Sequence, residues 1–288
     1  MTFKILQNEI LAPYVSWKVG GPADHLFIPQ NLSDLSAYLK QLPNNTNVFF
    51  LGLGSNLLIR DKGIRGVVIA TQKMLNHFEM VEDDVIRAEA GVSCGTLARF
   101  AARNGLSGIE FLAGIPGTIG GALAMNAGCA GSETWLHVSG VELIDKHGQV
   151  KRISADEFSY GYRYVSIPED HWFVAGYFKL SSEPPEKCLQ KIRELLDYRT
   201  ATQPINQPSC GSTFRNPEGT FAGKLIEKVG LKGYCLGGAM VSPKHANFIV
   251  NLGHSTAADI ENLIYYIKEQ VMQKTGIELT LEVKIVGE

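Results

Sequence analysis

Apolar and polar residues alternate along this chain with two periods, and each period predicts its own kind of element. Apolar runs or period-two alternation predict strands at 26–29, 48–51, 63–69, 138–144, 149–153, 173–180, 248–250 and 277–285, and a hairpin over 76–89 that turns at Asp83-Asp84. Apolar residues at helical spacing predict helices at 33–42, 96–104, 184–200, 221–229 and 256–271. Strands and helices in this order indicate an α/β pattern, in which ligands collect at the turns beyond strand ends.

Two helix starts carry capping signals. Ser33 precedes the apolar-periodic residues of the first helix, and Thr256 with Asp259 forms a capping box for the last one, which should end at Gly276. The proline-rich loop 203–212 interrupts regular structure and is the best candidate for a domain boundary.

Two glycine-rich turns are the most demanding backbone segments. One, 52–56 (GLGSN), follows the strand 48–51; the other, within 108–131, has glycines at 114, 117, 120 and 121 and leads into small residues, 122–127, that could open a helix. Glycine permits positive φ and close approach, so such turns suggest main-chain N–H groups directed at an anion. The Gly-x-Gly-Ser-Asn of the first turn is a weak signal by itself, and two such turns in one chain are a better one. The second turn is neither a P-loop nor a Gly-x-Gly-x-x-Gly fingerprint. A diphosphate cradle of another fold fits best.

Two other interpretations of the second turn stay open at this point. No charge occurs between Glu110 and Glu133, a length that could cross a membrane, although six glycines, Pro116 and Asn126 make a poor continuous helix. A purely structural turn that packs a helix against a sheet would also need these glycines.

Composition narrows the class of protein. The 288 residues predict two or three domains, and 45% hydrophobic with 19% charged residues are typical of a globular protein. A net charge of −2 without a Lys/Arg cluster indicates neither a nucleic-acid nor a membrane partner. The amino terminus lacks the features of a signal peptide, so we expect a cytoplasmic location. Five scattered cysteines and seven histidines without ligand spacing predict reduced thiols and no metal site.

Periodicity alone gives structural roles to two charged residues. Three tyrosines surround Arg163 in 157–167, which is typical of a guanidinium stacked on aromatic rings in a sheet. Glu282 lies on the polar face of the alternating segment 277–285, as a solvated carboxylate would.

Several blocks nevertheless occur together in one order, and in these the chain resembles the UDP-N-acetylenolpyruvoylglucosamine reductase family over nearly its whole length. The blocks are 20–24 (GGPAD), 51–58 (LGLGSNLL), 113–122 (AGIPGTIGGA), 125–128 (MNAG), 162–163 (YR), 211–217 (GSTFRNP), 233–251 and 282–287 (EVKIVG). The resemblance implies an α+β protein with an FAD-binding fold of the vanillyl-alcohol-oxidase kind. It implies two α/β FAD subdomains, 1–75 and 76–203, and a substrate-binding domain, 204–276, with 277–288 returning to the first subdomain.

The resemblance also implies the activity, which is the NADPH-dependent reduction of the enolpyruvyl group of UDP-N-acetylenolpyruvoylglucosamine to UDP-N-acetylmuramate for bacterial peptidoglycan. FAD is the implied cofactor, and NADPH and the UDP-sugar are expected to use the same cleft of a monomer. The implied catalytic residues are Arg163, Ser212 and Glu282, and the implied substrate contacts are Tyr162, Asn216 and His245. The implied FAD contacts are Gly52, Gly54, Ser55, Asn56, Gly114, Ile115, Pro116, Gly117, Thr118, Gly120, Gly121 and Asn126.

The chain departs from the family pattern at one catalytic block. The family often has Tyr-Arg-x-Ser, whereas Val165 stands here at the serine position and Ser166 follows it. The chain also lacks the insertion of the longer subtype, so it resembles the shorter one.

Two alternatives come from other functional classes. A flavin oxidase of the same fold that acts on a sugar or hydroxy acid would reoxidise rapidly in air, and a non-catalytic nucleotide-sugar sensor would purify colourless. The fold alone does not distinguish these two alternatives from the reductase, because function depends on the residues of the site.

Overall fold

A computed structural model describes residues 5–72 and 74–288 of the chain, in two compact units. Unit 1 comprises the described part of Met1–Leu6, His25–Leu53 and Gly66–Tyr198, and unit 2 comprises Gln7–Asp24, Gly54–Arg65 and Arg199–Glu288. Each unit has a hydrophobic core of its own. The expected division into two FAD subdomains and a substrate domain stays a prediction.

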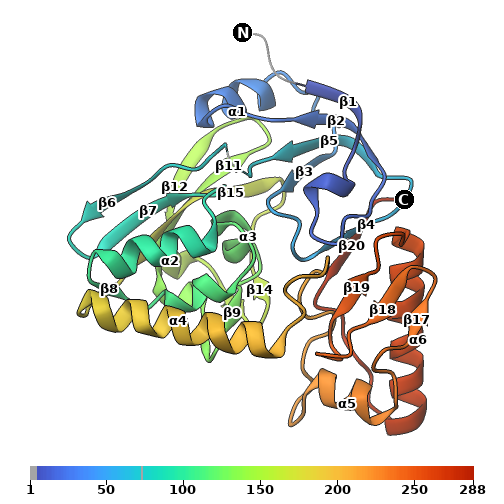
Figure 1. The fold of residues 1–288 in the computed structure, drawn as a ribbon. Coiled ribbons are helices and arrows are strands. Elements are labelled where there is room, and N and C mark those ends of the chain that lie inside the picture. The colour runs from blue at the N-terminus through green and yellow to red at the C-terminus, as the bar shows by residue number, and fades with distance from the viewer. Residues whose placement is uncertain (1–4, 73) are drawn as a thin grey trace. The chain divides into compact units, whose positions relative to one another are not determined.

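Unit 1 is built on a five-stranded antiparallel sheet in the order β12-β11-β15-β7-β6. Its strands are β6 (Phe78–Glu82), β7 (Val85–Glu89), β11 (Val138–Asp145), β12 (Val150–Ser154) and β15 (His171–Lys179). Three helices, α2 (Cys94–Arg103), α3 (Ile119–Ala124) and α4 (Pro185–Thr202), bury their apolar sides against one face of this sheet (Figure 1). The hairpin predicted to turn at Asp83-Asp84 is confirmed as β6 and β7.

The opposite face of this sheet carries a second core. Ile144 and Val174 of the sheet contact a cluster from α1 (Leu32–Leu39), β3 (Val48–Leu51) and β5 (Ile64–Ala70). β3 and β5 pair in parallel, within a sheet ordered β1-β2-β5-β3 that also contains β1 (Ile5–Ile10) and β2 (Pro22–Phe27). Helix α1 is capped by Asn31, not by Ser33 as predicted, because the extended Asn31 backbone lets its side chain accept a hydrogen bond from the Asp34 amide.

Unit 2 is an α+β unit whose core is packed against helix α6 (Ala257–Thr275). Its elements are α5 (Ala222–Lys228), the sheet β17 (Cys235–Leu236), β18 (Ala239–Val241) and β19 (Ile249–Asn251), and the parallel pair β4 (Leu57–Ile59) and β20 (Lys284–Val286). The predicted capping box at Thr256 is confirmed, and α6 ends at Gly276 with a φ of 71°. Trp17 is fully buried in this core and donates its indole N–H to the Ile249 carbonyl oxygen at 2.7 Å.

Short elements connect these layers. In unit 1 they are β8 (Leu106–Ser107) with β16 (Ser181–Ser182), β9 (Gly128–Cys129) with β10 (Ser132–Glu133), and β13 (Tyr160–Gly161) with β14 (Tyr164–Val165).

Two predicted elements differ from the structure. The segment predicted as a strand over 277–285 forms a strand only at β20, preceded by a single antiparallel bridge from Leu281 to Phe214. Helix α3 spans Ile119–Ala124 and ends before Asn126, whose φ of +40° cannot continue a helix. Within the described residues, no helix combines the length and apolarity that crossing a bilayer requires.

Candidate active site

The two glycine turns meet within unit 1 at Gly52 and Thr118. A Cβ atom on Gly52 would lie 2.5 Å from the Thr118 hydroxyl oxygen, and one on Gly120 would lie 2.8 Å from the Cβ atom of Ala90. The Thr118 hydroxyl is buried and has no hydrogen-bond partner among the described residues. A buried hydroxyl without a partner is costly, so a ligand that accepts its hydrogen bond would fit here. A phosphate oxygen of a dinucleotide is such an acceptor.

Part of the second turn has another role. The amides of Ile119 and Gly120 donate to the carbonyl oxygens of Val92 and Ala90, each at 2.9 Å. These two N–H groups therefore dock the start of α3 onto the chain that follows β7, and they are not directed at an anion. The structural interpretation of these glycines is thus correct for this half of the turn, while Thr118 supports the ligand interpretation.

The second half of the first turn lies in unit 2, where it contacts the segments of Cys210 and Glu282. The Asn56 side chain, an implied FAD contact, donates to the Glu282 carbonyl oxygen at 3.0 Å. The Cys210 thiol lies 3.4 Å from the carbonyl oxygens of Gly54 and Leu57, and its burial raises its pKa to about 12. Cys210 therefore remains a neutral donor that holds the turn, and all five cysteines of the chain are free thiols.

Arg163 occupies the tip of the hairpin formed by β13 and β14. Its backbone has a φ of +57°, which is uncommon for a residue with a side chain. One terminal nitrogen donates to the Gly128 carbonyl oxygen at 2.8 Å, the other to the Asn126 carbonyl oxygen at 3.4 Å, and the guanidinium lies 4.9 Å from the Tyr162 ring centre. The predicted stacking on an aromatic ring is therefore present, and the carbonyl contacts aim the cation as well.

The side chain of Asn126 holds this hairpin in place. It is fully buried, donates to the Gly161 carbonyl oxygen at 3.0 Å and accepts from the Trp135 amide at 3.0 Å. Both ends of the side-chain amide are thus used within the protein, so the side chain holds the hairpin that carries Arg163. The Asn126 amide donates to the Leu123 carbonyl oxygen at 3.3 Å, and contact of Asn126 with FAD stays a prediction. Val165, at the usual serine position, packs against the unit 1 core and anchors the hairpin by apolar contact.

Ser212 and Glu282 are brought together in unit 2 by main-chain pairing. The Glu282 amide donates to the carbonyl oxygen of Thr213, and the Arg215 amide donates to that of Thr280, both at 2.9 Å. This pairing places the two implied catalytic side chains on adjacent extended segments, although they are far apart in the sequence.

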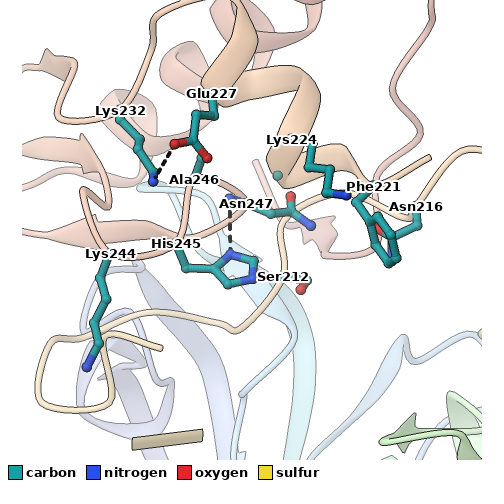
Figure 2. A pocket seen from close by; sticks show the side chains of 11 residues that line it. Ser212, Asn216, Phe221, Lys224, Glu227, Lys232, Lys244, His245, Ala246 and Asn247 are labelled. Carbon is teal, nitrogen blue, oxygen red and sulfur yellow. Dashed lines mark hydrogen bonds and ion pairs between the residues drawn. The ribbon is translucent and has the colours of Figure 1, made fainter. Parts of the chain in front are cut away.

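A pocket of about 350 Å³ opens beside Ser212 (Figure 2). Three implied residues, Ser212, Asn216 and His245, line it together with Phe221, Gly223, Lys224, Glu227, Lys232, Lys244, Ala246 and Asn247. Three lysines against one glutamate make this pocket suited to an anionic ligand. Sequence reasoning missed the lysines because they come from separate segments and form no cluster along the chain.

Each lysine also has a contact within unit 2. Lys232 pairs with Glu227 at 2.8 Å, the Lys244 ammonium donates to the Thr200 carbonyl oxygen at 2.6 Å, and the Lys224 ammonium lies 5.1 Å from the Phe221 ring centre. The Asn216 side chain accepts a hydrogen bond from the Ala222 amide at 3.1 Å, at the start of α5.

His245 is held as a neutral imidazole. Its Nδ1 atom accepts a hydrogen bond from the Asn247 amide at 3.3 Å, which leaves the proton on Nε2 (Figure 2). Burial lowers its pKa below the ordinary 6.5, and the nearby Lys232 lowers it further, although a backbone hydrogen bond acts in the opposite direction.

A pH dependence of stability follows from His245. Because its folded-state pKa is below 6.5, the unfolded chain binds the proton more readily. The contribution of neutral His245 to the free energy of unfolding is therefore full above about pH 6.5 and is lost as the pH falls toward its folded-state pKa. We expect His245→Gln to remove part of this fall in urea titrations between pH 5 and 8. His137, whose pKa burial also lowers, accounts for another part, which His137→Gln should remove independently. An unchanged pH slope in His245→Gln would contradict the assignment.

A cluster with metal-ligand atoms lies in unit 1, where no motif predicted one. Glu110, Glu183 and Cys188 bring ligand atoms within 4.8 Å of one another. The Lys191 ammonium lies 2.6 Å from the Glu183 carboxylate and 3.4 Å from that of Glu110. A cation of the protein therefore already balances these carboxylates.

These features and a family model define the class of protein as a flavoprotein. The FAD-binding domain model matches residues 23–154, and the model for the C-terminal domain of UDP-N-acetylenolpyruvoylglucosamine reductase matches residues 203–286. The chain is 52% identical over 285 residues to a UDP-N-acetylenolpyruvoylglucosamine reductase of Legionella pneumophila strain Corby, a match that covers 99% of this chain and 92% of the relative. It is 51% identical to that of Alkalilimnicola ehrlichii, covering 97% and 94%.

A solved structure agrees with the sequence matches. The crystal structure of UDP-N-acetylenolpyruvylglucosamine reductase from Thermus caldophilus has a TM-score of 0.82 and 33% identity, with both chains fully covered. The chain belongs to the UDP-N-acetylenolpyruvoylglucosamine reductase family. The predicted α+β FAD-binding fold is thereby confirmed.

Proposed function

We propose that this protein reduces the enolpyruvyl group of UDP-N-acetylenolpyruvoylglucosamine to give UDP-N-acetylmuramate, with FAD as cofactor and NADPH as reductant, in peptidoglycan synthesis. The observation that carries the proposal is the pairing of the Ser212 and Glu282 segments through the Thr213 carbonyl oxygen, beside a pocket lined by three lysines. This arrangement offers a proton donor in the lining of a site for an anionic nucleotide sugar, with the main chain of Glu282 paired to the segment that carries it.

The residues present fit FAD. The Thr118 hydroxyl is buried without a protein partner, and Gly52 leaves space in front of it. The Thr118 hydroxyl would donate a hydrogen bond to an oxygen of the diphosphate. When bound, FAD supplies the hydride chemistry that links NADPH to the enolpyruvyl double bond.

The side chains of this protein then handle charge and the proton. Hydride addition at C3 of the enol ether pushes charge onto the substrate carboxylate, and the Arg163 guanidinium is assigned to neutralise it. A hydrogen bond shared with the Glu282 carboxyl helps to hold the enediolate. The Ser212 hydroxyl donates the proton to C2, which a weak acid can do because the carbanion-like centre is strongly basic.

The substrate-binding assignments follow the same logic. Asn216 and His245 line the pocket in unit 2, where their polar atoms suit a nucleotide sugar, and Tyr162 adjoins Arg163 in unit 1. We infer that the protein acts in the cytoplasm as a monomer, and that NADPH and the UDP-sugar use the same site in turn.

An anaerobic absorbance experiment tests the function. Limiting NADPH should bleach the flavin of the purified protein, and enolpyruvyl-UDP-N-acetylglucosamine should restore the oxidised spectrum. Bleaching without recovery would exclude this substrate. Rapid recovery in air without the substrate would indicate an oxidase, and a colourless protein that FAD does not reconstitute would indicate a binding protein.

A cofactor prediction follows from Thr118. We expect Thr118→Val, which keeps the volume and removes the hydroxyl, to weaken FAD binding roughly 10-fold, the size of one hydrogen bond to a charged group. Fluorescence titration of the apoprotein with FAD measures this directly. Thr134→Val is the matched control, because Thr134 is equally buried but donates to the Ala127 carbonyl oxygen at 2.7 Å. Equal loss of FAD affinity in both variants would overturn the assignment.

A further inference from the structure

The main-chain segment that carries Ser212 is gripped by the side chain of Asn247. This side chain accepts a hydrogen bond from the Phe214 amide at 3.0 Å and donates to the Phe214 carbonyl oxygen at 2.8 Å. The Asn247 carbonyl oxygen accepts from the Thr213 amide at 2.8 Å. Asn247 is 3% exposed, so all three bonds are shielded from water.

These bonds determine both position and direction of the segment. A primary amide presents an NH2 donor group and an acceptor oxygen in one plane, and pairing both with a single residue leaves that residue little freedom to rotate or slide. On the opposite edge, the Thr213 carbonyl oxygen accepts from the Glu282 amide. The residue that follows Ser212 is thus held from two sides, by Asn247 and by the chain of Glu282.

The same residue also orients the pocket. The Asn247 amide donates to Nδ1 of His245, so one residue is bonded to the Ser212 segment and to an imidazole of the lining (Figure 2). Proton transfer from a weak acid requires close alignment, and a displacement of about 1 Å can slow such a step about 100-fold.

We propose that Asn247 is a positioning residue for Ser212: it fixes the hydroxyl where the proton is delivered to the substrate. The proposal rests on the proposed function, because the proton transfer belongs to that reaction. Asn247 itself touches neither reacting atom.

Asn251 provides a matched control for ordinary stabilisation. It is also buried, at 7% exposure, and its side chain donates to the Trp17 carbonyl oxygen at 2.8 Å and accepts from the amides of Gly253 and Ser255. Its partners lie outside the Ser212 segment. Asn247→Ala removes both side-chain bonds to the buried Phe214 backbone, and Asn251→Ala removes the bond to the buried Trp17 carbonyl oxygen, so both should lower stability to urea.

The test compares the two half-reactions in the FAD-loaded protein by stopped flow. In Asn247→Ala we expect reoxidation by enolpyruvyl-UDP-N-acetylglucosamine to slow about 10- to 100-fold, with bleaching by NADPH unchanged. In Asn251→Ala we expect the ratio of the two rates to stay at the wild-type value. Equal slowing of both half-reactions in Asn247→Ala, or no slowing of reoxidation, would overturn the proposal.

Asn247→Asp gives a second readout at nearly constant volume, and it serves if the alanine variant does not fold. A carboxylate can accept from the Phe214 amide but cannot donate to the Phe214 carbonyl oxygen, whereas a protonated carboxyl can. We expect the reoxidation defect of Asn247→Asp to shrink as the pH is lowered, relative to wild type at each pH. A defect that does not change with pH would contradict the positioning role. If the substrate does not reoxidise the wild-type protein either, the proposed function itself is wrong, and the inference about Asn247 is wrong with it.

Discussion

Ser212→Ala should slow the oxidation of reduced flavin by the enolpyruvyl substrate about 10²- to 10⁴-fold, the usual size of a general-acid contribution, and leave reduction by NADPH unchanged. The asymmetry arises because only the second half-reaction needs a proton at C2. The main chain around residue 212 is held by Asn247 and by the Glu282 segment, so loss of one hydroxyl should not displace the strand. Stopped-flow absorbance of the two half-reactions measures the effect.

Ser209→Ala is the matched control for Ser212→Ala. It makes the same chemical change three positions earlier in the same loop, outside the pocket lining. We expect both half-reactions to keep their wild-type rates. Equal slowing of the two half-reactions in Ser212→Ala would remove Ser212 from the role of proton donor.

Arg163→Lys should lower the rate of reoxidation by the substrate about 10²- to 10³-fold, which is the typical effect of losing one preorganised group that stabilises developing negative charge. The change is not conservative here. The planar guanidinium donates to the carbonyl oxygens of Gly128 and Asn126 at once, and a lysine ammonium lacks this fork geometry. Single-turnover reoxidation at saturating substrate measures the loss.

Arg152→Lys provides the comparison for Arg163→Lys. The Arg152 guanidinium lies 3.9 Å from the Tyr177 ring centre, so it shares the cation–π environment but belongs to no implied site. Arg152→Lys should leave reoxidation unchanged. If Arg163→Lys changed only KM and not the rate at saturation, the residue would contribute uniform binding rather than charge stabilisation.

Local sequence signals predicted most of the elements well, for physical reasons. The Thr256–Asp259 capping box, the left-handed Gly276 and the turn at Asp83-Asp84 all act within a few residues, so the sequence pattern contains the whole interaction. Ser33 was a wrong cap because the helix begins earlier, with Asn31 as its N-cap, so Ser33 lies inside the first turn.

The candidate site was accessible from sequence only through family blocks. Alternation placed Glu282 on a solvated face and stacking explained Arg163, so neither periodicity nor composition distinguishes these residues. The three pocket lysines come from separate segments, and the side chain of Asn247 bonds to Phe214, 33 residues away, so no local pattern indicates their roles.

The sequence by itself thus determined the helices, most strands, the glycine turns and, through ordered blocks, the family. Only the tertiary structure decided which groups those turns use: the amides of Ile119 and Gly120 bind carbonyl oxygens, whereas the buried Thr118 hydroxyl has no hydrogen-bond partner among the described residues. It also decided that Ser212 is held beside Glu282 by main-chain pairing and by Asn247. The reason is that main-chain hydrogen bonds between distant segments depend on where the chain returns, and every residue carries the same backbone donor and acceptor.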